Sequence, residues 1–100
     1  MSMFAIHLED DPERAADRQR LDTAHRAFLC ALAERVVMAG ALGRSGPDGL
    51  PSGEFWVVRA ASELQARELI ETDPLFSAGI RRSIRIWPYE PLREPRAGAG

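Results

Sequence analysis

The chain has 100 residues, of which 45% are hydrophobic and 28% are charged, and this balance is typical of one small globular domain. Its net charge of −2, without a basic patch, argues against nucleic acid as a partner, and no apolar run approaches the ~20 residues that span a bilayer. Because the chain has one cysteine and no leader-like N-terminus, we expect a cytoplasmic protein that does not bind membranes.

The N-terminal third predicts a strand followed by a helix. Residues 3–8 (MFAIHL) are apolar with a loose alternation that favours a strand, and a charged turn follows. A helical period is clear from about Asp17 to Val36. The apolar stripe of this helix consists of Leu21, Phe28, Leu29, Leu32 and Val36. Arg18 falls at the phase of the stripe, but near the helix start, where a long side chain can reach water.

The middle of the chain predicts two strands separated by a loop. Residues 36–42 (VVMAGAL) begin with β-branched residues, which indicates that the helix runs into a second strand there. Residues 43–53 are dense in Gly, Pro, Ser and Asp and predict a loop, with Asp48-Gly49 as a tight turn. Residues 54–60 (EFWVVRA) are rich in aromatic and β-branched residues and predict a third strand.

The remaining residues predict a second helix and a last strand. Ser62 and Gln65 form a capping-box pattern that opens a helix reaching about Thr72. Asp73-Pro74 ends this helix, since the residue before a proline avoids helical geometry. Gly79 predicts a turn, and residues 83–89 (SIRIWPY) alternate as a strand does.

The predicted order β-α-β-β-α-β is that of the ferredoxin-like α+β fold, a four-stranded antiparallel sheet with both helices on one face. We expect this domain to cover residues 1–91 and to be followed by a flexible tail at 92–100. The helix-free face would expose more apolar surface than a monomer usually does. We therefore expect a homodimer, in which two such faces pack together as a dimeric α/β barrel.

Two polar residues fall on apolar helix faces. On a helical wheel of about 100° per residue, His25 lies in the middle of the first helix's apolar stripe. Asp73 lies on the apolar face of the second helix, seven residues after Ala66 and four after Leu69. A buried carboxylate and a buried imidazole both need partners, so we expect them to meet. Asp73 would then orient the ring, and its second nitrogen would face a cavity as a general base.

Other interpretations of these residues stay open. A histidine on an apolar helix face is usually a hydrogen-bonded core residue, and an aspartate before a proline is usually a turn or capping residue. Asp22 is a rival partner for His25 on the same helix. A metal site of His7, His25 and Asp73 lacks a close-spaced ligand pair, so we expect no metal.

Several short motifs together resemble the YciI-like (YCII-related) family. They are HLEDDP and AHRAFL near the N-terminus, MAGAL in the second strand, DPLFSAGI after the second helix, and IRIWPY in the last strand. The resemblance covers roughly Met3 to Pro91 and departs from the family pattern at Arg26 and Ala41. It implies a ferredoxin-like fold, a dimeric α/β barrel, and His25 and Asp73 as the active-site pair.

Two functions are compatible with these observations. The first is a cofactor-free acid–base enzyme, a lyase, isomerase or dehydrochlorinase, acting on a small cyclic or aromatic compound through His25 and Asp73. Candidate walls of its substrate pocket are His7, Phe55, Trp56 and Trp87. The second is a non-catalytic dimeric module that binds a small ligand or another protein through the same pocket.

Overall fold

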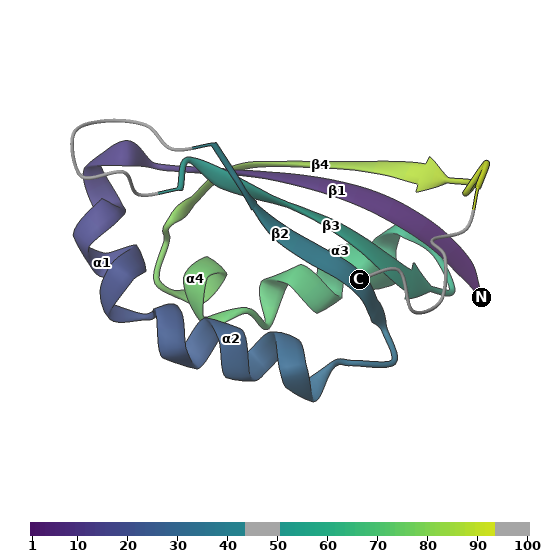
Figure 1. Cartoon of the computed structure of the whole chain (residues 1–100), viewed down its shortest axis with the longest axis horizontal. Helices are drawn as coiled ribbons and strands as arrows, with labels where there is room; N and C mark the ends of the chain where they lie inside the picture. Colours follow the sequence, from purple (N-terminus) through teal and green to yellow (C-terminus); the bar gives the residue numbers. More distant parts are fainter. Residues whose placement is uncertain (44–50, 94–100) are drawn as a thin grey trace.

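The computed structural model describes residues 1–43 and 51–93, and it confirms the ferredoxin-like prediction. Four antiparallel strands stand in the order β2-β3-β1-β4, and all helices lie on one side of the sheet (Figure 1). The strands are β1 (Ser2–Asp10), β2 (Val36–Leu42), β3 (Gly53–Ala60) and β4 (Arg81–Tyr89). The helices are η1 (Pro12–Arg14), α1 (Ala15–Arg20), α2 (Asp22–Ala31), α3 (Glu63–Glu71) and α4 (Pro74–Ser77).

Strand alternation decides which side chains enter the core. On the central strand β1, Phe4, Ile6 and Leu8 point toward the helices, and on β3 their neighbours Trp56 and Val58 do the same. Ala66, Leu69 and Ile70 of α3 complete this buried apolar cluster. The core therefore lies between one face of the sheet and the helix layer.

The predicted helix over 17–36 is two shorter helices, followed by a turn and the start of β2. The α-helical geometry breaks at Leu21, which separates α1 from α2, and α2 ends at Ala31. The chain then turns back so that Val36 can pair with β3, and the turn is closed by hydrogen bonds from Arg35 and Val36 to the carbonyl of Leu32. The stripe predicted at Leu32 and Val36 still packs on the core, but through a turn and a strand.

The second helix begins as its cap predicted. The Ser62 side chain accepts a hydrogen bond from the Gln65 amide, and the Gln65 side chain accepts one from the Ala61 amide. A short helix that the sequence did not predict, α4, follows, and the predicted turn at Gly79 comes directly after it with a φ of +74°. The predicted turn at Asp48-Gly49 and residues 94–100 of the predicted tail lie outside the described residues.

The opposite face of the sheet carries no helix among the described residues (Figure 1). Met38, Trp87 and Tyr89 are exposed on it at 53%, 45% and 37%. No helix in the described part of the chain is long and apolar enough to cross a membrane.

Candidate active site

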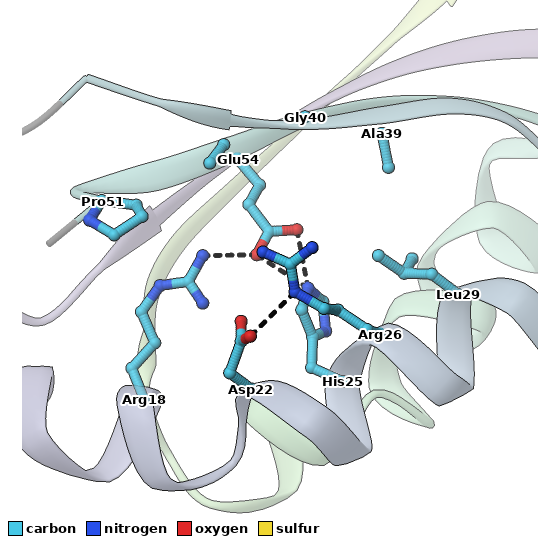
Figure 2. A pocket seen from close by; sticks show the side chains of 10 residues that line it. Arg18, Asp22, His25, Arg26, Leu29, Ala39, Gly40, Pro51 and Glu54 are labelled. Atoms are coloured by element: carbon cyan, nitrogen blue, oxygen red, sulfur yellow. Dashed lines mark hydrogen bonds and ion pairs between the residues drawn. The ribbon is translucent and has the colours of Figure 1, made fainter.

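His25 is the centre of the site. It is 3% exposed, it faces the sheet from α2, and its ring stacks on Trp56 with the centroids 6.2 Å apart. Its Nδ1 lies 2.9 Å from Oδ1 of Asp73, so the structure brings the predicted pair together. Its Nε2 lies 2.9 Å and 2.7 Å from the two carboxylate oxygens of Glu54 (Figure 2). The ring is therefore held between two carboxylates.

Asp73 has a structural role and faces the histidine as well. It caps α4, because its Oδ1 accepts a hydrogen bond from the Leu75 amide at 3.0 Å. The same oxygen faces His25, while Oδ2 accepts a hydrogen bond from Arg81 at 3.0 Å. The side chain is completely buried, and these donors satisfy it. Asp73 is therefore both a helix-capping residue and the partner of His25, the two roles that the sequence had suggested as alternatives.

Glu54 occupies the position at which the sequence predicted an open cavity. It begins the helix-facing row of β3 and is 3% exposed. Besides His25, its carboxylate accepts hydrogen bonds from Trp56 Nε1 at 2.8 Å and from Arg18 Nη2 at 2.6 Å. The second nitrogen of His25 was expected to face a cavity; His25 does line a pocket, but Nε2 is bound there by Glu54, a partner that the sequence did not predict.

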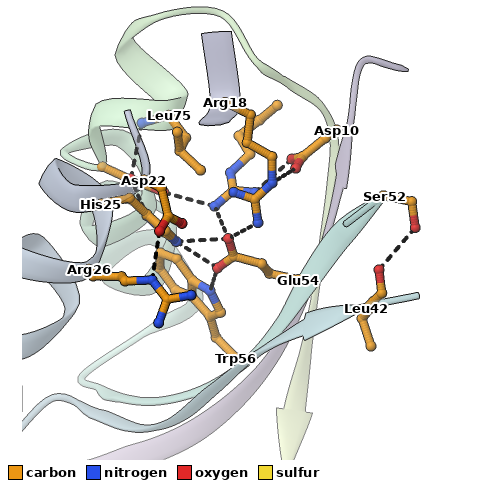
Figure 3. Close-up of polar contacts among 12 residues, drawn as sticks. Asp10, Arg18, Asp22, His25, Arg26, Leu42, Ser52, Glu54, Trp56 and Leu75 are labelled. Carbon is orange, nitrogen blue, oxygen red and sulfur yellow. Dashed lines mark hydrogen bonds and ion pairs between the residues drawn. The ribbon is translucent and has the colours of Figure 1, made fainter. Parts of the chain in front are cut away.

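Six buried side chains form one ionic cluster: Asp10, Arg18, His25, Glu54, Asp73 and Arg81. Figure 3 labels Asp10, Arg18, His25 and Glu54 of this cluster. Arg81 bridges Asp10 at 2.6 Å and Asp73 at 3.0 Å. Arg18 Nε lies 2.9 Å from Asp10 Oδ2, but the angle does not make a hydrogen bond. With His25 protonated, three cations face three carboxylates, and the cluster is neutral.

The cluster shifts the pKa values of its members. Burial lowers the pKa of His25, but the hydrogen bonds to Asp73 and Glu54 outweigh it and raise that pKa to about 9. Burial raises the pKa of Glu54, but the hydrogen bond from His25 and the charge of Arg81 bring that pKa down to about 2. At neutral pH the imidazolium form of His25 therefore faces two carboxylates.

An open pocket of about 140 Å³ lies between α2 and the edge strand β2 (Figure 2). Polar residues on its walls are Arg18, Asp22, His25, Arg26 and Glu54. The other lining residues are Leu29, Ala39, Gly40, Ala41 and Pro51. The rival partner Asp22 does not bind His25 but pairs with Arg26, with Oδ2 2.8 Å from Nε. The ionic cluster thus meets solvent through this pocket.

A family model for the YCII-related domain matches residues 2–90. The chain belongs to the YCII-related domain family. No curated protein matches its sequence.

Among solved structures, this YCII-related domain is similar to 5-chloro-2-hydroxyhydroquinone dehydrochlorinase (TftG) from Burkholderia phenoliruptrix AC1100, in complex with 2,5-dihydroxybenzoquinone. The TM-score is 0.79 at 24% identity, over 88% of this chain and 93% of that one. It is also similar to a protein of unknown function from Nitrosomonas europaea, with a TM-score of 0.53 at 18% identity over 95% and 94% of the two chains. These similarities establish the fold.

The other predicted pocket residues of the YCII-related domain are divided between the two faces of the sheet. Trp56 lies behind His25 and binds Glu54, so it supports the site from the core. His7, Phe55 and Trp87 do not line the pocket, because their positions alternate with the helix-facing residues and put them on the helix-free face. His7 is therefore separated by the sheet from the other two members of the considered metal site. In the described part of the chain, no group of three or more His, Cys, Asp or Glu residues has a geometry that could hold a metal ion.

The sequence contained signals for three of the four cluster residues that went unpredicted. Asp10 continues the helix-facing row of β1, and Glu54 begins the helix-facing row of β3. Arg18 has the phase of the apolar stripe, but it is 5% exposed, so the expectation that it reaches water is wrong. Arg81 gave no such signal, because the alternation of β4 would put its side chain on the helix-free face. A register shift between Glu9 and Asp10 pairs Arg81 with Asp10 instead.

Proposed function

We propose that this YCII-related domain is an acid–base enzyme, a lyase or isomerase, that acts on a small hydroxylated cyclic or aromatic compound. The observation that carries the proposal is a buried His25, held between Asp73 and Glu54, at the wall of an open pocket. A cavity of about 150 Å³ accommodates one benzene ring, so a pocket of about 140 Å³ suits a single ring. The fold shared with a dehydrochlorinase is consistent with this substrate class.

In the proposed reaction, His25 acts first as an acid. At neutral pH its ring is protonated, and Glu54, which shares the Nε2 proton, lines the same pocket. His25 donates a proton to a ring carbon of an enolic substrate, and the neutral imidazole takes a proton back from a ring hydroxyl. This exchange converts the enol into a ketone. A halide on the protonated carbon can then leave with its bonding electrons, while a second, conjugated ring hydroxyl loses its proton to water and becomes a carbonyl group, so that the substrate loses one proton and one halide overall. Asp73 holds the ring and stabilises the imidazolium.

Turnover of hydroxyhydroquinones, hydroxyquinones and lactones, followed by absorbance, tests this proposal. We expect His25→Ala to reduce kcat by about 10²- to 10⁴-fold, the usual contribution of an acid–base residue. Asp73→Asn should reduce it by less, because the amide keeps the shape of the carboxylate. Thr23→Ala, on the exposed side of α2, is the matched control. Full activity in His25→Ala would exclude the proton-transfer role.

The pH dependence separates an acid from a base. If His25 starts as the acid, kcat/KM falls as the pH rises through about 9, where the free enzyme loses the proton. A general base would give the opposite limb, with kcat/KM rising toward pH 9. A profile without either limb would contradict both roles.

The second candidate function is a non-catalytic module that binds a small ligand. One observation favours it: both ring nitrogens of His25 already have carboxylate partners, as in a structural network. This function predicts that ring compounds bind without turnover, and that His25→Ala weakens binding and stability together. Turnover by the wild-type protein would exclude it.

We also propose that the domain forms a homodimer through its helix-free face. Exposed Met38, Trp87 and Tyr89 form an apolar surface there, of the kind that proteins usually cover. Sedimentation of the wild type should give twice the mass of one chain, and Trp87→Glu should shift the equilibrium toward monomers. A monomeric wild type at micromolar concentration would contradict the proposal.

A further inference from the structure

Arg18 is a member of the ionic cluster whose guanidinium is not fully hydrogen-bonded within the protein. Its Nη2 donates a hydrogen bond to Glu54, and its Nε lies against Asp10 in the interior. The third nitrogen, Nη1, has no polar partner among the described residues, and it is not one of the buried unpaired atoms. Arg18 lines the pocket, where Figure 2 shows its guanidinium directed inward from α1. Nη1 therefore keeps some contact with solvent, on a residue that lines the pocket.

The rest of the guanidinium is held firmly. The side chain of Arg18 is 7% exposed, and the side chains of Asp10 and Glu54 beside it are each 4% exposed. Nε and Nη2 are directed at the carboxylates of Asp10 and Glu54, whereas Nη1 can exchange water for an acceptor atom of a ligand. A position next to Nη1 therefore suits an oxygen atom that accepts hydrogen bonds.

Arg18 and His25 converge on the same place. Nη2 of Arg18 and Nε2 of His25 lie 2.6 Å and 2.7 Å from one oxygen, Oε2 of Glu54. A small ring in the pocket can therefore reach both residues at once. The opposite wall is formed by Ala39, Gly40 and Ala41 of β2, which leave room for a flat ring.

We propose that Arg18 is a further catalytic residue, whose Nη1 binds a ring oxygen of the substrate while His25 exchanges a proton with the ring. This inference rests on the proposed function and narrows its substrate class to rings that carry a ketone, enolate or phenolate oxygen. A fixed cationic donor stabilises the negative charge that such an oxygen gains during proton transfer. A ring without an acceptor oxygen would leave Nη1 unpaired and bind weakly.

Binding of 2,5-dihydroxybenzoquinone, which is anionic at neutral pH, tests the proposal by calorimetry. Hydroquinone, which has the same ring but is neutral, is the control ligand, and acetate is the control for a simple anion. We expect the wild type to bind the quinone at least tenfold more tightly than either control. Equal binding of acetate, or no binding of the quinone at millimolar concentration, would overturn the ligand class.

Arg18→Lys tests the residue itself. Lysine keeps the charge that Asp10 and Glu54 require, but it lacks the forked second nitrogen. We expect at least tenfold weaker binding of the quinone, unchanged weak binding of hydroquinone, and a lower kcat on any turned-over ring. Wild-type affinity for the quinone in Arg18→Lys would overturn the assignment. Loss of turnover in His25→Ala with an unaffected Arg18→Lys would leave the proposed function standing without this residue.

A measurement on the unmodified protein avoids dependence on the folding of the variant. The NMR signal of the Arg18 side chain should shift when the quinone is added. The signal of Arg14, which is bound to Asp17 and the Ala78 carbonyl, is the control and should not move. An unmoved Arg18 signal at saturating quinone would overturn the proposal.

Blocking the pocket locates the ligand. Ala39 lines the pocket from β2, so Ala39→Leu should abolish binding of the quinone. Ala24→Leu makes the same change on the exposed side of α2 and should leave binding unchanged. Full binding to Ala39→Leu would place the ligand outside this pocket and overturn the role of Arg18.

Discussion

The space between the helices and the sheet has two unlike halves. At one end, Phe4 and Val58 of the sheet pack with Ile70 of α3 in an apolar core. At the other end, where β1 ends and β3 and β4 begin, the ionic cluster fills the same layer. Both halves are buried, but one consists of apolar side chains and the other of paired charges.

The difference teaches where the fold is stabilised and where it carries chemistry. Apolar packing stabilises the fold without directional contacts, whereas a buried ion pair often contributes no more than apolar residues of similar size would. Glu54 and Arg18 lie beside the pocket, so this half of the interior combines fixed charges with access for a ligand. We therefore expect the two halves to respond differently to mutation, pH and salt.

The largest expected effect comes from breaking the ionic half. Glu54→Ala removes a carboxylate that Arg18, His25 and Trp56 all contact, and it leaves Nη2 of Arg18 and Nε2 of His25 without their acceptor in the interior. We expect the free energy of unfolding in urea to fall by about 3–5 kcal/mol. Glu68→Ala, on the exposed side of α3, should change it by less than about 0.5 kcal/mol. A loss as small as that of the control would mean that the cluster is not held together through Glu54.

A change of pH tests the same half without mutation. The pKa of His25 is raised from 6.5 to about 9, so its contribution is complete below pH 6.5 and is lost as the pH rises through 9. The pKa of Glu54 is lowered from 4.5 to about 2, so its contribution is complete above pH 4.5 and is lost as the pH falls through 2. The loss of stability at each end of the pH range amounts to about 3 kcal/mol. Both losses reflect largely the same interaction, that between His25 and Glu54.

Urea unfolding at several pH values measures both limbs. We expect maximal stability between about pH 4.5 and 6.5, and His25→Gln should remove most of the alkaline limb. If the stability of His25→Gln still falls at high pH as in the wild type, another group causes that fall.

A smaller effect is expected in the apolar half. Ile6→Val removes one methylene group from the completely buried Ile6. We expect a loss of about 0.5–1.5 kcal/mol that does not vary between pH 5 and 9. A loss that follows the pH limb of His25 would show that the two halves are coupled.

The smallest effect is expected at the mouth of the pocket. Asp22 and Arg26 form an ion pair whose side chains are 44% and 77% exposed. We expect Asp22→Ala to cost about 0.2–1 kcal/mol at low salt and less at high salt. A cost above about 2 kcal/mol, or one that salt does not reduce, would place this pair energetically with the buried cluster.

Much of the fold followed from periodicity in the sequence. Alternation predicted the first and last strands, β-branched and aromatic residues predicted the two middle strands, and a capping box predicted the start of the second helix. Helical phase placed His25 and Asp73 on apolar faces. The break at Leu21 and the end of α2 at Ala31 were not predicted, because the pairing of Val36 with β3 overrides a continuous helical pattern. Tertiary pairing decided those boundaries.

The candidate site was predicted only in part. Two of its six charged members were named from the sequence, because a polar residue on an apolar face stands out. Glu54 was missed at the start of a hydrophobic strand, where a charged residue usually marks the end of burial. The pocket walls His7, Phe55 and Trp87 were assigned to the wrong face, because an aromatic residue in a strand does not by itself indicate which face it occupies.

The ionic cluster also has a consequence for the order of folding. Its six members come from β1, α1, α2, β3, the start of α4 and β4, and Arg81 and Asp10 are 71 residues apart in the chain. Contacts of such long range form late, since the intervening chain must lose its freedom before they can close. The apolar half also joins distant segments, because Phe4 of β1 packs with Ile70 of α3. A chain that stops before β4 would lack Arg81, so Asp10 and Asp73 would lose the cation that bridges them and Glu54 would lose a charge that lowers its pKa.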